Sequence, residues 1–495
     1  MTRRITALLC AFVMLLSLAA CAPHSATDNM VSPTDTADIS LVPPTMPVVR
    51  INTDDGGFDF ATQPTREDKL RDAIEYVGAT VSVEGCDEQY AFTDAAAQVK
   101  ARGNYTLDYP KKAIRIKFDE KQGMLGLNDG QEFKNWVLLA EWKDLSMCNN
   151  ATAFYLAEAI LGADGYYCTD FLNVELYINN TYWGVYLLVE QQEVKKGRTS
   201  VSEVEDDYTG TDIGYFFEYD GYYLDERRVP NGGGDPTFEI NYGSYADGKP
   251  GHVVLEGYNT DGMHGYTVKS DINSDEQLDF IASYLENTYK ILYSAVCEDK
   301  HYAFNESCTA LVPADGKTTR EVVSEVIDLQ SLVDIYLLNE IVINPDIGWS
   351  SFFMSVDMSE QGSHKLIFEA PWDFDSCFGI RAGWEQAVGM YVRQSQNPWM
   401  CLLHEEDWFM DMVEDKWAQL KENGVPETAI ERVRAYKTVY AEYYARNYER
   451  WEERIIYGNH ELVPQLNSCQ SQDEAADYLC NWLHKRFNYL DHELS

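Results

Sequence analysis

The chain has 495 residues, with 81 acidic against 39 basic side chains and a formal net charge of −42 at pH 7. Such a charge repels nucleic acid and acidic lipid, and it favours basic partners or divalent cations. Hydrophobic residues make up 45% of the chain, which is enough for a sizeable globular core, and beyond the N-terminus no apolar run is long enough to span a bilayer.

The N-terminal residues are typical of a secretion signal that ends at a lipid attachment site. Arg3 and Arg4 precede an apolar run, residues 7–18, that is too short to span a bilayer. Leu18-Ala19-Ala20-Cys21 matches the pattern of a bacterial lipobox, in which the cysteine thiol receives the lipid. We predict a lipoprotein signal peptide at residues 1–20 and an extracytoplasmic protein that contacts the membrane through lipidated Cys21 only. An ordinary secretory signal that contains a cysteine is the alternative.

Residues 21–48 are rich in Ser, Thr, Pro and Asp, which predicts a disordered tether before a globular body. Of the eleven cysteines, Cys10 and Cys21 belong to the leader region, and the remaining nine cannot all pair within one chain. No C-x-x-C motif occurs, which disfavours a structural zinc site.

Strand patterns dominate the first half of the body. Residues 113–118 alternate apolar and basic, so Arg115 and Lys117 should share one face of a strand. Asn179-Asn180 is typical of a hairpin turn. Further elements are expected at residues 135–140, 174–178 and 182–190 as strands, and at residues 146–161 as a helix.

The second half is more helical, and two loops bear acidic residues. A helix over residues 329–342 should end before Pro345 and lead into a loop with Asp346. Asp373 and Asp375 flank Phe374 in a second loop, about 7 Å apart if the chain is extended. Other elements are expected at residues 351–356 and 364–368 as strands, and within 274–294 and 405–448 as helices.

These residues could support phosphoryl transfer, which needs cations at the phosphates, carboxylates for Mg²⁺ and a carboxylate for the attacking hydroxyl. Arg115 and Lys117, with Lys112 nearby, form a basic island in an acidic chain. A solvated strand edge explains these basic residues equally well, and a single Asp is usually a turn residue or a helix cap. No Walker or G-x-G-x-x-G motif, no H-E-x-x-H and no G-x-S-x-G occurs.

Short motifs follow one another in a fixed order across residues 100–400: Arg102-Gly103-Asn104, Pro110-Lys111-Lys112, Arg115-Ile116-Lys117-Phe118, Trp136 to Ala140, Tyr182-Trp183-Gly184, Leu188 to Gln191, Lys196-Gly197-Arg198, Asn344-Pro345-Asp346 and Trp372-Asp373-Phe374-Asp375. Taken together and in this order, they resemble the CotH family, the spore-coat protein H type of atypical protein kinase.

This resemblance implies an α+β, diverged bilobal protein-kinase-like fold, with a strand-rich N-lobe (49–200), a helical C-lobe (201–400) and a C-terminal helical extension (401–495). It also implies transfer of the γ-phosphate of ATP, with Mg²⁺ or Mn²⁺, to Ser or Thr of cell-surface or spore-coat proteins. The acidic surface suits a basic or Ser-rich protein substrate.

The resemblance also implies roles for individual residues. Asp346 would be the catalytic Asp, and Asp373 and Asp375 would bind metal. Ser351 stands where kinases have a second metal ligand, an Asn. The phosphates would face Arg115, Lys117 and Lys112, and Glu190 would help to seat the nucleotide.

Two other functions fit the same residues. A cell-surface binding or scaffold protein could retain a kinase-like frame and use its 33 Tyr and 11 Trp for contacts. A metal-dependent phosphohydrolase would use the same carboxylates with water as the acceptor.

Overall fold

The structure is a computed structural model that describes residues 37–241, 264–395, 397–454 and 458–495. The predicted signal peptide, Cys21 and the first part of the predicted tether lie outside the described residues. Within that tether, η1 (Ile39–Leu41) is a short 3₁₀ helix, and Val42 and Met46 are buried. The packed body therefore begins upstream of residue 49. None of the helices in the described ranges is both long and apolar enough to cross a bilayer.

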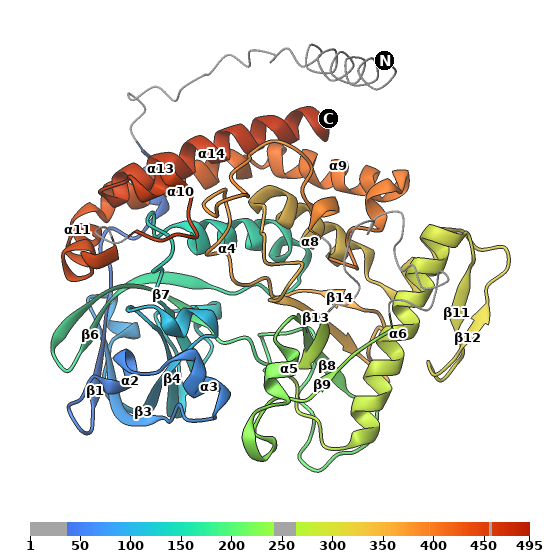
Figure 1. Ribbon diagram of the computed structural model, residues 1–495, viewed down its shortest axis with the longest axis horizontal. Helices are drawn as coiled ribbons and strands as arrows, with labels where there is room; N and C mark the ends of the chain where they lie inside the picture. Colours follow the sequence, from blue (N-terminus) through green and yellow to red (C-terminus); the bar gives the residue numbers. More distant parts are fainter. Residues whose placement is uncertain (1–36, 242–263, 396, 455–457) are drawn as a thin grey trace, which may run out of the picture. The chain divides into compact units, whose positions relative to one another are not determined.

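A closed barrel of seven strands forms from the first part of this body (Figure 1, blue to teal). The strand order is β1-β2-β3-β4-β5-β7-β6, and β1 closes the barrel by pairing in parallel with β6, from Val48↔Glu175 to Ile51↔Ile178. The other neighbours are antiparallel. The strands are β1 (Val48–Thr53), β2 (Val77–Glu84), β3 (Phe92–Arg102), β4 (Ala113–Gln122), β5 (Phe133–Leu139), β6 (Phe171–Ile178) and β7 (Thr181–Glu190).

Period-2 alternation gives the barrel its core. In β4, Ile114, Ile116 and Phe118 are at most 2% exposed inside the barrel, while Arg115 and Lys117 project outward as predicted. Asn179 and Asn180 join β6 to β7 with φ of 48° and 59°. These left-handed conformations suit Asn and confirm the predicted hairpin.

The second half contains a five-stranded sheet and most of the helices. The sheet order is β14-β13-β8-β10-β9, and β11 pairs with β12 as a separate hairpin. The strands are β8 (Gly214–Asp220), β9 (Thr237–Phe238), β10 (Gly265–Val268), β11 (Tyr302–Phe304), β12 (Leu311–Pro313), β13 (Phe352–Asp357) and β14 (Ile367–Phe368). The main helices are α4 (Asn149–Ile160), α6 (Asp275–Glu298), α7 (Thr319–Val326), α8 (Leu329–Val342), α9 (Asp407–Glu422), α10 (Val425–Val439), α11 (Ala441–Arg450) and α14 (Gln472–Glu493), and shorter ones are α2 (Asp59–Thr62), α3 (Arg66–Leu70), α5 (Tyr223–Glu226) and α13 (Pro464–Asn467).

Helix α8 lies at the centre of this half and sets the position of Asp346. Its N-terminus is capped by Asp328, whose carboxylate accepts a hydrogen bond from the Ser331 backbone N–H at 2.9 Å. It ends where Ile343 takes a φ of 47°, just before Asn344-Pro345, as predicted. Helices α9 and α14 pack against α8, and α10 packs against α4 and α14 (Figure 1).

The prediction of a bilobal protein-kinase-like fold is wrong, although the α+β content is as expected. The first strands close into a barrel, and the second half has a five-stranded sheet of its own. Alternation in the sequence identifies strands but not their partners. Closure here depends on β1 pairing with β6, more than one hundred residues later, and no local pattern specifies that pairing.

Candidate functional site

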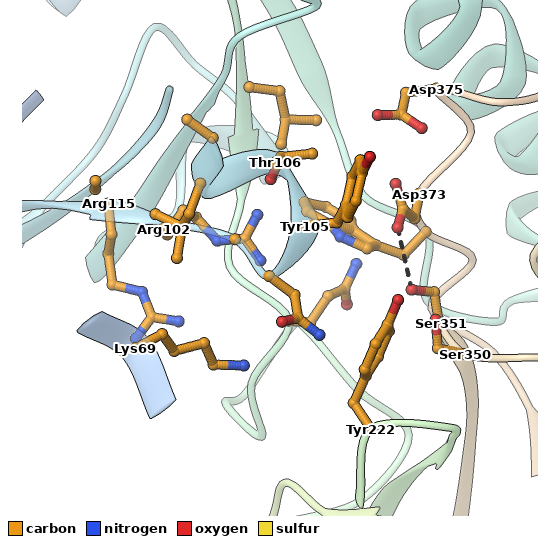
Figure 2. Close-up of a pocket in the computed structure, with 18 of the residues that line it drawn as sticks. Lys69, Arg102, Tyr105, Thr106, Arg115, Tyr222, Ser350, Ser351, Asp373 and Asp375 are labelled. Carbon is orange, nitrogen blue, oxygen red and sulfur yellow. Dashed lines mark hydrogen bonds between the residues drawn. The ribbon is translucent and has the colours of Figure 1, made fainter. Parts of the chain in front are cut away.

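A large cavity lies between the outer face of the barrel and the loops of the second half. Its volume is about 810 Å³. Figure 2 shows basic side chains, Lys69, Arg102 and Arg115, on one side of it and Asp373, Asp375 and Ser351 on the other. The cavity therefore brings together cations and carboxylates that lie far apart in the chain, from Lys69 to Asp375.

The basic side comes from β3, β4 and α3. Lys100 of β3 lies directly opposite Arg115 of β4, and Arg102 and Lys69 line the same wall. Burial, and then the charge of Arg115, lower the pKa of Arg102 to about 10. Burial also lowers the pKa of Lys100, with Arg115 as the next cause. Cations that are crowded in this way favour an anionic ligand.

Arg115 is oriented by one neighbour and keeps donors available. Its Nη2 donates to Gln191 Oε1 at 2.8 Å, while its buried Nε has no hydrogen-bond partner among the described residues. The loop after Arg102 closes over this wall. Gly103 has a φ of +130°, and a Cβ there would lie 2.2 Å from Thr106 Oγ1, so the position requires glycine.

The acidic side consists of Asp346, Asp373 and Asp375, all of which line the cavity. Asp346 Oδ1 accepts a hydrogen bond from Arg381 Nη1 at 2.6 Å, and the Asp346 backbone N–H donates to Asn344 Oδ1 at 2.9 Å. Burial, followed by the charges of Asp375 and Asp346, raises the pKa of Asp373 to about 8. Three carboxylates so arranged favour a bound cation or a proton.

Ser351 links Asp373 to Glu218, another acidic residue that lines the cavity. Its Oγ donates to Asp373 Oδ2 at 3.4 Å, and its backbone N–H donates to Glu218 Oε1 at 2.8 Å. Ser351 and Asp373 both have left-handed backbones, with φ of 61° and 65°. This conformation is uncommon for Ser, whereas Asp adopts it more readily.

The donor set fits a metal ion that is shared with a phosphate ligand. Among the residues that the structure describes, no three His, Cys, Asp or Glu side chains form a group that could hold a metal alone. Mg²⁺ commonly takes only one or two carboxylates and completes its shell with phosphate oxygens and water. Asp373 and Asp375 are the residues that would hold it, and the ion would neutralise charge on the phosphates.

Three predicted site residues lie outside the cavity. Lys117 is exposed on β4 and does not line it. Lys112 is 4% exposed and donates to the carbonyl oxygens of Leu107 and Tyr109, so its ammonium fixes the neighbouring loop. Glu190 is fully buried at the end of β7, and its Oε1 pairs with Arg198 Nε at 3.0 Å. The structure brings together the other five, Arg115, Ser351, Asp346, Asp373 and Asp375.

The sequence reasoning gave no role to Arg102 or Lys143. Arg102 belongs to the Arg102-Gly103-Asn104 motif. Gly103 in that motif was the one sequence signal that could have pointed to Arg102. Lys143 lies between β5 and α4, and its Nζ lies 3.6 Å from both Asp375 Oδ1 and Glu461 Oε2. Glu461 lies far beyond both acidic loops in the sequence, and no sequence pattern linked it to them.

One protein-family model matches most of the chain. A family model described as CotH kinase protein matches residues 99–490. A comparison with curated proteins found no match. The family match spans the barrel strands that bear Arg102 and Arg115, both acidic loops and the C-terminal helices. The chain belongs to the CotH kinase protein family.

Proposed function

We propose that this protein transfers the γ-phosphate of ATP to a Ser or Thr hydroxyl of cell-surface or spore-coat proteins. The observation that supports this function best is the single cavity in which Arg102 and Arg115 face Asp346, Asp373 and Asp375 (Figure 2). Triphosphate binding requires the cations, and phosphoryl transfer requires the carboxylates.

In this proposal each side of the cavity has one task. Arg102 and Arg115 bind phosphate oxygens, with Lys69 and Lys100 beside them. Asp346 orients the acceptor hydroxyl and takes its proton while the acceptor oxygen bonds to the γ-phosphorus and the bond to the ADP oxygen breaks. Because Asp346 is paired with Arg381 at 2.6 Å, the acceptor must compete with this pair for the carboxylate.

The side chains at the cavity rim favour a protein acceptor with basic residues. Trp349 lies three residues after Asp346 and is 44% exposed, with Tyr222 packed against it at a ring distance of 5.7 Å. Such a ring can bind a Lys or Arg side chain through its face. Asp72 lines the same cavity and adds negative charge for a basic residue of the acceptor, whereas Glu226 and Asp235 are already paired with Lys69 and Lys269.

We also propose that Cys21 is lipidated and that the protein works outside the cytoplasmic membrane. The lipobox pattern of residues 18–21 supports this location. Replacement of Cys21 by Ser should move the protein from the membrane fraction to the soluble fraction. Retention of the variant in the membrane fraction would contradict the proposed anchor.

The function is tested by phosphate transfer from γ-labelled ATP, with Mg²⁺ or Mn²⁺ and a basic Ser-containing peptide. Asp346→Asn and Asp373→Asn should each lower transfer by roughly 10²- to 10⁴-fold, the usual contribution of such groups. Asp299→Asn is the matched control, because Asp299 is 97% exposed and has a left-handed φ of 52° that Asn tolerates.

Three other outcomes would contradict the proposal. Phosphate release without incorporation would indicate a phosphohydrolase. Absence of ATP binding at millimolar concentration, in a folded protein, would exclude both enzymes and leave a surface-binding protein. Equal activity of the Asp346→Asn variant and the unmodified protein would exclude Asp346 as the catalytic base.

A further inference from the structure

A short segment near the C-terminus forms part of the cavity wall. This segment, residues 459–463, is called here the C-terminal strap. It pairs with the chain that follows the second acidic loop: the Ala382 N–H donates to the Glu461 carbonyl at 2.8 Å, and the Val463 N–H donates to the Ile380 carbonyl at 2.9 Å. Leu462 and Val463 are at most 3% exposed. The strap is therefore fixed by its backbone and its apolar side chains.

One strap side chain, Glu461, points at the acidic side of the cavity. Its Oε2 lies 3.6 Å from Lys143 Nζ and accepts a hydrogen bond from the Tyr109 hydroxyl at 2.9 Å. Lys143 Nζ lies at the same distance, 3.6 Å, from Asp375 Oδ1 and also donates to Ser376 Oγ. The ammonium thus lies between two carboxylates, one from the acidic loop and one from the strap.

Lys143 differs in position from the cations of the barrel wall. It comes from the loop between β5 and α4, is 10% exposed, and lies among the carboxylates rather than opposite them. Burial opposes its charge, but the negative charges of Asp375, Asp346 and Glu461 outweigh burial and raise its pKa. Lys143 is therefore a charged group next to the loops where the transferred phosphate must lie.

The second carboxylate changes what Lys143 does to Asp375. If Asp375 were the only carboxylate near Lys143, the attraction of the ammonium would act on Asp375 alone and would oppose binding of a metal cation there. Glu461 lies at the same distance of 3.6 Å from the ammonium as Asp375, so Lys143 is held between the two carboxylates and not by Asp375 alone.

We propose that Glu461 is a positioning residue that holds Lys143 beside the transferred phosphate, so that the C-terminal strap belongs to the active site. This inference rests on the proposed function. It gives the region after residue 400 a direct role in the reaction, in addition to its packing against α4 and α8.

The test compares Glu461→Gln and Glu461→Asp in the full chain, with Glu84→Gln as control. Glu84 ends β2, pairs with Arg50 and is 52% exposed. It does not line the cavity, so its replacement should leave activity unchanged.

Glu461→Gln removes the charge but leaves the backbone hydrogen bonds of the strap, so the melting temperature should stay near that of the unmodified protein. We expect kcat to fall roughly 10- to 100-fold, as for other groups that orient a reacting residue. KM for ATP should change by less than about threefold, because the barrel cations are intact. Glu461→Asp, which restores the charge, should recover most of kcat.

A second readout separates failure of this inference from failure of the proposed function. Acylation of Lys143 by an amine reagent, followed by mass spectrometry, reports its confinement without any phosphate transfer. Faster labelling in Glu461→Gln supports positioning by Glu461, even if the unmodified protein proves inactive and the proposed function fails. Equal labelling, or an unchanged kcat in an active enzyme, would overturn the inference. A rise in KM for ATP with kcat unchanged would overturn it too, because Glu461 would then act in nucleotide binding.

Discussion

Arg102 and Lys117 show how position within one sheet decides whether a cation can serve the site. Both project from the outer face of the barrel, Arg102 from the end of β3 and Lys117 from β4, but only Arg102 lines the cavity. We expect Arg102→Met to weaken binding of Mg·ATP roughly 10- to 100-fold, because one charge-assisted hydrogen bond contributes about 1.5–3 kcal/mol. Lys117→Met should change affinity less than about twofold. Isothermal titration of the two variants checks this, and equal losses would contradict the location of the phosphate site.

Asp373 should make the stability of the ligand-free protein depend on pH. Its pKa rises to about 8 on folding, first through burial and then through Asp375 and Asp346. A carboxyl whose pKa is raised destabilises the fold when it ionises, so the penalty is absent below about pH 4, grows toward pH 8 and is constant above.

Asp373→Asn removes this penalty and should stabilise the ligand-free protein by about 1–3 kcal/mol at pH 9. The gain should shrink as the pH falls toward 4. Urea unfolding at a series of pH values measures it, with Asp299→Asn as a control that should show no such trend. A variant that is less stable than the unmodified protein at pH 9 would contradict the raised pKa.

At the scale of elements, a fully buried ion pair ties the C-terminal helix to the loop of Asp346. Arg486 of α14 pairs with Glu340 of α8 at 2.9 Å, and both side chains are 0% exposed. Glu340 also accepts hydrogen bonds from the backbone N–H groups of Tyr391 and Val392 at 2.7 and 2.9 Å. The Tyr391 hydroxyl in turn donates to the Asn344 carbonyl, two residues before Asp346.

Arg486→Met should therefore lower the free energy of unfolding by about 3–5 kcal/mol, because it leaves the Glu340 carboxylate buried without its cation. The double variant with Glu340→Gln should cost less than the sum of the two single variants, since both remove the same interaction. Lys317→Met, which removes an ion pair that is 39% and 45% exposed, should cost less than about 1 kcal/mol. Chemical unfolding of the four variants measures these changes in the free energy of unfolding. If the changes of the two single variants simply add in the double variant, Arg486 and Glu340 are not a coupled pair.

The elements that local sequence determines were predictable, and those that depend on distant partners were not. Helix α8 follows from its apolar residues and from Pro345 beyond its end, and β4 follows from its alternation. Barrel closure requires β1 to meet β6, and sequence separation hides that contact.

The same distinction applies to the candidate site. Asp346, Asp373 and Asp375 were recognisable because each lies in a short motif beside a predicted element. Glu190 also lies in a motif, but its partner is Arg198 of the next motif, and the two form a buried structural pair outside the cavity. Lys143 and Glu461 are single charged residues in loops, and only the folded chain brings them together.

At the scale of the whole molecule, the net charge of −42 should make the two proposed substrates respond differently to salt. A basic acceptor is attracted by the overall field and by the acidic rim, whereas ATP is repelled by the field and attracted only by the local cations. Salt screens interactions beyond the Debye length, which is about 10 Å at 0.1 M and about 3 Å at 1 M. Between about 0.05 and 0.3 M NaCl, KM for a basic peptide should rise several-fold, and KM for ATP should change much less.

The matched control is the same peptide with each Lys replaced by Gln, which should bind more weakly at low salt and show little salt dependence. This comparison separates attraction by charge from general effects of salt on the enzyme, because the latter would change both peptides equally. Equal salt dependence of the two peptides would mean that the acidic surface does not select the acceptor. Recognition would then depend on uncharged contacts, such as those that exposed Trp349 offers beside Asp346.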